Sequence, residues 1–138
     1  MKTLKLALLL SLFAMNLKAQ EANKNDEEVL TFVEQEAEFV GGVNAMIKYL
    51  AENIKYPDNA VKNNIQGKVY IRFIVDKAGN INTVKVIKGI PDCPECDAEA
   101  VRVIKGMPKW NPAMQNGKPV NMYFNIPINF MLDKPNEE

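Results

Sequence analysis

The segment from Val120 to Phe130 constrains the fold more than any other part of the chain. Apolar and other residues alternate along it without interruption: Val120, Met122, Phe124, Ile126, Ile128 and Phe130 alternate with Asn121, Tyr123, Asn125, Pro127 and Asn129. A period of two over this length predicts a long β-strand with one face on a core and the other in water. Proline has no N–H to donate to a neighbouring strand, so Pro127 predicts that one side of this strand is an open sheet edge.

Two further segments have an extended pattern and predict a hairpin. Residues 68–75 alternate between apolar and polar, and residues 81–88 resume an extended pattern. Between them, Asp76 to Asn80 has the composition of a turn and contains Gly79. These two segments and the last one account for three strands.

Apolar residues at helical spacing predict two helices. The first runs from Val43 to Ile54, after a Gly41-Gly42 turn, and the second is expected from about Asp97 to Met107, where Pro108 ends it. A further helical turn or two is expected at 58–64. The predicted fold class is α+β, with two helices packed on one face of a small three-stranded antiparallel sheet.

Composition excludes several classes of site. The 138 residues contain no histidine, which excludes Ser-His and Cys-His nucleophiles and imidazole ligands to a metal. Two cysteines cannot form a four-thiolate zinc site within one chain, and 17 basic against 17 acidic residues provide no excess of positive charge for nucleic acid. We expect a non-enzymatic binding domain without catalytic residues, metal, cofactor, small-molecule substrate or nucleic-acid partner.

The amino-terminal 19 residues have the three parts of a secretory signal peptide. Lys2 and Lys5 precede an apolar stretch from Leu6 to Met15, and a short polar exit ends at Ala19. The apolar stretch of about ten residues is too short to cross a bilayer as a helix. We expect cleavage after Ala19 and export to the periplasm.

Residues 20–38 are strongly acidic, with seven acids against one lysine. Such a block repels itself, which predicts a flexible leader. The alternative is a short helix or strand laid against the domain, because apolar residues interrupt the block at Val29, Leu30, Phe32 and Val33. At the other end, residues 133–138 are expected to form a polar tail.

Cys93 and Cys96 are expected to form a structural disulfide. The periplasm is oxidising, and Pro94 bends the segment between the two cysteines so that their side chains can meet. The alternative is a thiol-disulfide redox site, since a helix start lowers the pKa of a thiol. A thioredoxin-like protein would carry that motif directly after a buried strand early in the chain, which is not its position here.

Six short motifs, taken in order, resemble the carboxy-terminal domain of the TonB energy transducers over residues 39–132. They are Tyr56-Pro57-x-x-Ala60, residues 67–76 with Gly79 in the turn, Asp97-x-Glu99-Ala100, Met107-Pro108-x-Trp110-x-Pro112, residues 117–120, and residues 126–130. Each motif alone is weak, and their common order and spacing make the resemblance specific.

The resemblance implies that the last strand pairs with a short peptide, the TonB box, of an outer-membrane receptor. Main-chain hydrogen bonds give affinity in this mode of strand addition, and alternate side chains give selectivity. The expected partner-binding residues are Lys55, Tyr56, Pro57, Val120, Asn121, Met122, Tyr123, Phe124, Asn125, Ile126 and Pro127. For Tyr56, a purely internal role between two helices is the alternative.

Two departures from the force-transmitting members of that family are relevant to function. Their uncleaved transmembrane helix and long proline-rich spacer have no counterpart here, and the acidic leader spans at most about 60 Å when extended. We therefore expect a domain that binds a receptor without pulling on it. The open edge is also compatible with a second use, as a homodimer interface.

Overall fold

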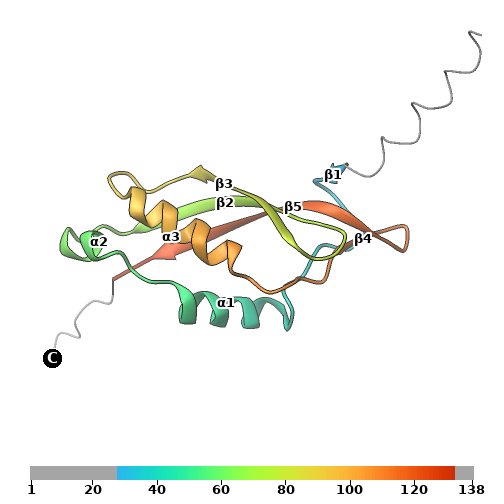
Figure 1. The fold of residues 1–138 in the computed structure, drawn as a ribbon, viewed down its shortest axis with the longest axis horizontal. Helices are drawn as coiled ribbons and strands as arrows, with labels where there is room; N and C mark the ends of the chain where they lie inside the picture. The colour runs from blue at the N-terminus through green and yellow to red at the C-terminus, as the bar shows by residue number, and fades with distance from the viewer. Residues whose placement is uncertain (1–27, 133–138) are drawn as a thin grey trace, which may run out of the picture.

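The computed structural model describes residues 28–132 and forms an α+β domain (Figure 1). The expected signal peptide, the first part of the acidic leader and the polar tail lie outside these residues. In chain order the elements are β1 (Val29–Leu30), α1 (Gly42–Asn53), α2 (Asp58–Lys62), β2 (Gly67–Val75), β3 (Ile81–Lys88), α3 (Pro94–Lys105), β4 (Ala113–Gln115) and β5 (Lys118–Phe130).

The sheet is built around β5 and β2. These strands pair antiparallel without interruption from Gly67 opposite Phe130 to Val75 opposite Met122. β3 pairs antiparallel with the other side of β2, and β1 pairs parallel with the other side of β5. The strand order is therefore β1-β5-β2-β3, with β4 attached to β5. The predicted hairpin and last strand are confirmed.

The prediction of a three-stranded, wholly antiparallel sheet is wrong, because within residues 28–132 the sheet has five strands and β1 is parallel to β5. The two additional strands, β1 and β4, are too short, at two and three residues, for a period to be recognised. The sequence nevertheless marks the end of β4 by a turn. Asn116 and Gly117 join β4 to β5 with φ values of 52° and 72°, the conformation of a two-residue hairpin turn that Asn-Gly favours.

The acidic segment lies against the domain from Glu28 onward. Val29 and Leu30 pair with Asn121 and Met122, and main-chain bridges connect residues 35 and 38 with residues 114 and 111. Residues 28–38 thus correct the prediction of a flexible leader and follow its alternative, a short strand. The apolar side chains explain this, since Ala37 is buried and Val33 packs against the core.

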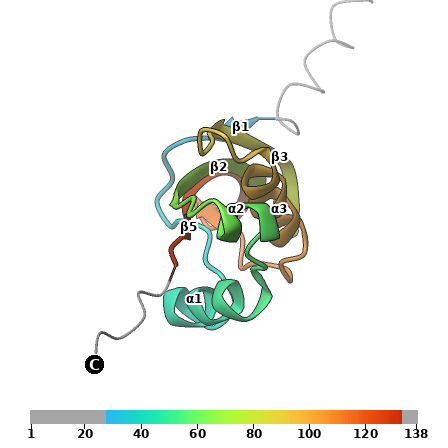
Figure 2. The same cartoon turned by 90° about the vertical axis from the view of Figure 1, so that its left-hand side faces the viewer.

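α2 and α3 contribute buried side chains to the core, whereas α1 lies to one side of it (Figures 1 and 2). α3 buries Cys96, Ala100, Val103 and Ile104. Trp110 closes the core, since it is only 3% exposed and its ring contacts those of Phe39, Phe73 and Phe124. The two predicted helices are present as α1 and α3, but the prediction that both pack on one face of the sheet is corrected, because α1 lies beside β5 and the second helix over the core is the short α2.

Candidate functional site: a groove between α1 and β5

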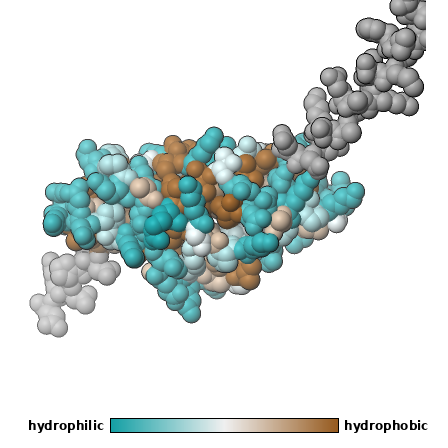
Figure 3. Space-filling view, viewed as in Figure 1, coloured by the Kyte–Doolittle hydropathy of each residue, from teal (hydrophilic) through white to brown (hydrophobic). Residues whose placement is uncertain are grey.

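The apolar stripe of α1 is largely uncovered. No residue of this helix is buried, and Val43 and Ile47 are 64% and 56% exposed. Met46, Leu50 and Ile54 reach the core only in part. Figure 3 shows apolar surface over α1 on a largely hydrophilic face of the molecule. An amphipathic helix normally buries such a stripe, so this surface can accept a partner.

A cavity of about 360 Å³ separates α1 from β5. Its helix wall includes Val43, Ile47 and Leu50, and its strand wall is formed by residues 126–129. Successive side chains of a strand point to opposite faces, so a cavity lined by four consecutive residues lies at the lateral edge of the strand. The groove therefore exposes the edge of β5 and not only one of its faces.

A second cavity of about 280 Å³ continues the groove toward the start of α1. It shares Val43 and Met46 with the first cavity and adds Phe39, Trp110 and Phe124. Together the two cavities follow β5 from Phe124 to Asn129. An extended segment of about six residues would match this length.

The open edge of β5 is shorter than the sequence predicts. Val120 pairs with β4, and Asn121 and Met122 pair with β1, so these three positions already have partners within the chain. Asn121 is further fixed by its side chain, which accepts a hydrogen bond from Lys77 N at 2.9 Å. In the described part of the chain, no strand pairs with the outer side of Phe124 to Phe130. The prediction of an open edge beginning at Val120 is corrected accordingly.

Pro127 identifies which main-chain groups point outward. In an antiparallel pair, the N–H and C=O of one residue point to the same neighbour, and successive residues alternate between neighbours. Proline has no N–H to donate, and the pairing of β5 with β2 runs past Pro127 without interruption. The main chain at Pro127 therefore points away from β2. Asn125 and Asn129 then present their N–H and C=O groups to the groove, whereas the N–H of Tyr123 is directed at Leu30 of β1.

Lys55, Tyr56 and Pro57 lie beyond the carboxyl-terminal end of α1, where the Tyr56 ring contacts the Phe130 ring with centroids 5.5 Å apart. The Tyr56 hydroxyl donates a hydrogen bond to the Ile65 carbonyl, and burial raises the pKa of Tyr56. Tyr56 thus has the internal role considered as its alternative, and partner contact at these three residues stays a prediction. The loop nevertheless meets β5 at one end of the groove.

A charged pair on α3 anchors the end of α1. Arg102 donates from Nε to Glu99 at 2.9 Å and from Nη2 to the Asn53 carbonyl at 2.8 Å, and Lys55 N donates to Glu99 at 3.0 Å. The hydrogen bond from Arg102 is the main cause that lowers the pKa of Glu99. Tyr49 adds a bond from its hydroxyl to the Val103 carbonyl at 2.9 Å. These contacts hold α1 in place although none of its residues is buried.

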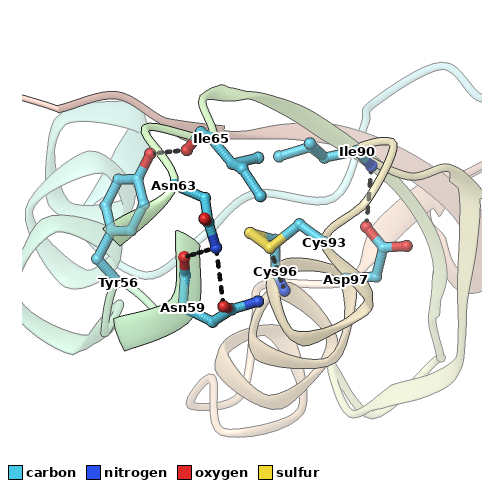
Figure 4. The surroundings of a disulfide bond; sticks show 8 residues. All are labelled: Tyr56, Asn59, Asn63, Ile65, Ile90, Cys93, Cys96 and Asp97. Atoms are coloured by element: carbon cyan, nitrogen blue, oxygen red, sulfur yellow. Dashed lines mark hydrogen bonds between the residues drawn. A yellow bond between two sulfur atoms is a disulfide. The ribbon is translucent and has the colours of Figure 1, made fainter. Parts of the chain in front are cut away.

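The predicted disulfide is present between Cys93 and Cys96, at the start of α3 (Figure 4). Both cysteines are fully buried, and Asp97 accepts a hydrogen bond from Ile90 N at 3.0 Å, which fixes the preceding loop. A redox pair needs an accessible sulfur that can become a reactive thiolate. The buried disulfide therefore favours the structural role over the redox alternative.

Other kinds of site are not found between residues 28 and 132. No group of three or more cysteine or acidic side chains there is placed to hold a metal ion. In the same region, no helix has the length and apolar character needed to cross a membrane.

Sequence reasoning missed the helix wall of the groove. The stripe of Val43, Met46, Ile47 and Leu50 was visible in the sequence, but helical spacing alone does not distinguish a stripe that faces a core from one that faces a groove. No other feature of the sequence distinguishes the two.

The model of the carboxy-terminal domain of the Gram-negative bacterial TonB protein matches residues 52–132, which is more than half of the chain. Two solution structures of the Helicobacter pylori TonB carboxy-terminal domain are similar. One is 20% identical with a TM-score of 0.48 and covers 65% of this chain and 79% of that one. The other is 22% identical with a TM-score of 0.49 and covers 67% and 95%.

No curated protein matches the chain. The family match includes α2, α3 and all of β2 to β5, and thus the strand that forms one wall of the groove. The chain belongs to the family of TonB carboxy-terminal domains.

Proposed function

We propose that this domain captures an extended peptide of an outer-membrane receptor by adding it as a strand to the outer edge of β5. The observation that carries the proposal is the groove along Phe124 to Asn129, where outward main-chain groups lie beside an uncovered apolar helix. Strand addition needs both features, since the main chain supplies affinity and the neighbouring pockets supply selectivity. Membership of the TonB carboxy-terminal family supports the choice of a receptor peptide as the partner.

The pleat of the sheet gives the orientation of the bound segment. Side chains directly opposite each other on neighbouring strands point to the same face. Phe124, Ile126 and Ile128 belong to the face that carries the core, and Ile126 and Ile128 also line the groove. Every second side chain of the captured segment would therefore enter the apolar groove against α1, which favours apolar residues at those positions.

A proline scan of β5 tests the proposal. Asn125→Pro removes an outward N–H and leaves the pairing with β2 intact, whereas Asn125→Ala removes the same side chain and keeps the N–H. The test uses both variants in cells, with a photo-crosslinking residue at position 129 that traps the partner for mass spectrometry. We expect the proline variant alone to lose the crosslinked product. Equal crosslinking in both variants would refute strand addition.

Export is part of the same proposal. The signal-peptide pattern of residues 1–19 supports a periplasmic domain that begins at Gln20 and binds its receptor without transmitting force. Amino-terminal sequencing of the protein from a periplasmic fraction tests this. Intact Met1 in the inner membrane would contradict it and favour an anchored, force-transmitting protein.

The second use of the edge is a homodimer, in which two copies of β5 pair with each other. Sedimentation across a wide concentration range distinguishes the two uses, because a dimer formed through β5 would dissociate on dilution and would compete with the peptide. A monomer at every concentration is the result expected for peptide capture.

A further inference from the structure

Arg72 extends across the sheet toward the open edge of β5. It belongs to β2, opposite Asn125, but its Nε donates to the Asn125 side-chain oxygen at 3.0 Å and its Cζ lies 5.3 Å from the centroid of the Tyr123 ring. The guanidinium group therefore lies over β5, between β2 and the groove edge. Both terminal nitrogens remain available, because the contacts of Arg72 within residues 28–132 use only Nε and the face of the group.

The surroundings of Arg72 contain other cations but no carboxylate. Among residues 28–132, no acidic side chain is paired with Arg72. The strands β2, β3 and β5 contain no aspartate or glutamate at all. Lys68 and Arg72 alternate with buried residues of β2, and Lys85 and Lys88 lie opposite Arg72 and Tyr70, so the face of the sheet opposite the core is positively charged.

A cavity of about 420 Å³ lies on this face beside Arg72. Tyr70, Arg72, Lys88 and Asn125 line it, together with Ile87 and Pro127. Pro127 and Asn125 are also edge positions of β5. The cavity therefore adjoins the place where an added strand would lie.

We propose that Arg72 recognises a carboxylate, from aspartate or glutamate, on the segment that β5 captures. This inference rests on the proposed strand addition. The residue of the added strand opposite Asn125 points to the same face as Arg72, and the Asn125 side chain already holds the guanidinium over that position. A guanidinium with two unused nitrogens matches a carboxylate in a bidentate pair.

The same charges argue against a second copy of β5 as the occupant. β5 has no acidic residue and begins with Lys118, so a second copy would bring no carboxylate to Arg72. It would also place a second positively charged sheet face beside the first. A partner segment with apolar residues toward α1 and an acidic residue toward Arg72 complements both faces.

The effect of this pair on affinity is moderate. Arg72 is exposed, so the ion pair is weakened by water and salt, and we expect about a fivefold gain in affinity at low salt that diminishes as salt is added.

Two synthetic peptides provide the test. Both are acetylated, amidated peptides in which valine alternates with threonine, and the central threonine is replaced by glutamate in one and by glutamine in the other. Each peptide is titrated into three proteins, all comprising the whole domain from Gln20 onward: the wild type, Arg72→Gln and Lys85→Gln. Lys85→Gln is the matched control, because it removes one charge from the same face on the strand farther from the groove.

We expect the glutamate peptide to bind wild type about fivefold more tightly than the glutamine peptide does. Arg72→Gln should abolish the difference, and Lys85→Gln should retain most of it. An unchanged glutamate preference in Arg72→Gln, or equal binding of the two peptides to wild type, would overturn the role of Arg72 while leaving strand addition intact. If neither peptide binds, strand addition itself is refuted and the role of Arg72 with it.

Discussion

Ile47 offers the clearest separation between folding and binding. It is 56% exposed in the free domain, lies in the middle of α1 and lines the groove. Fully burying an isoleucine side chain is worth up to about 3 kcal/mol, so burying the exposed half under a captured peptide would contribute about 1.5 kcal/mol. Ile47→Ser should therefore weaken binding roughly tenfold.

The same substitution should leave the free energy of unfolding within about 0.5 kcal/mol of wild type, because the side chain is largely exposed and serine has a similar helix propensity. Urea unfolding measures the stability, and fluorescence anisotropy of a labelled valine–threonine peptide measures the affinity. Val61→Ser is the control, since Val61 is 45% exposed on α2 and does not line the groove. Unchanged affinity in Ile47→Ser, or a loss of stability of about 2 kcal/mol, would refute the reasoning.

Three further predictions concern stability. Gly79→Ala should lower the free energy of unfolding by more than about 3 kcal/mol, because a Cβ there would lie 2.0 Å from a main-chain oxygen. Gly117 has a similar positive φ but lies in open space, so Gly117→Ala should lower it by only about 1 kcal/mol. Urea unfolding measures both values. Replacing Cys93 and Cys96 by serine should cost about 2 kcal/mol from the short closed loop, with peptide affinity unchanged, and alkylation of the native protein should label neither cysteine. The lowered pKa of Glu99 stabilises the fold above the ordinary glutamate pKa, and this contribution is lost as the pH falls through the folded-state pKa. Glu99→Gln should therefore lower stability more at about pH 7 than at about pH 3.

Each stability prediction has its own contrary result. Equal costs for the two glycine substitutions would mean that the close approach at Gly79 is relieved by a shift of the chain. Rapid labelling of one cysteine would favour the redox alternative. An equal loss of stability at both pH values in Glu99→Gln would show that packing, and not the charge, accounts for the effect.

The elements with a long uninterrupted pattern were predictable from the sequence. The alternation before Phe130, the hairpin around Gly79 and the helix stop at Pro108 are local signals, and tertiary contacts reinforce each of them. β1 and β4 were not predictable by period, because two or three residues do not define one. β4 was nevertheless marked by the Asn116-Gly117 turn.

The candidate site was predictable only in part. Pro127 correctly indicated an edge, but the sequence did not reveal that β1 and β4 occupy the first part of it. Ile47 and Val43 have the same spacing as core residues, and their exposure depends on where α1 lies relative to β5. Arg72 has no sequence signal of its own, since its direction across β5 is set by Asn125 and Tyr123.

The most direct test of strand addition is backbone amide exchange along β5, measured by NMR with and without the glutamate-containing valine–threonine peptide. If the peptide forms an added strand, exchange should slow at Asn125 and Asn129, whose N–H groups point to the groove, while the amides of Phe124, Ile126 and Ile128, already bonded to β2, should change little. Slowed exchange along β3 instead, or binding of the peptide with no protection at those two amides, would contradict peptide capture at the edge of β5.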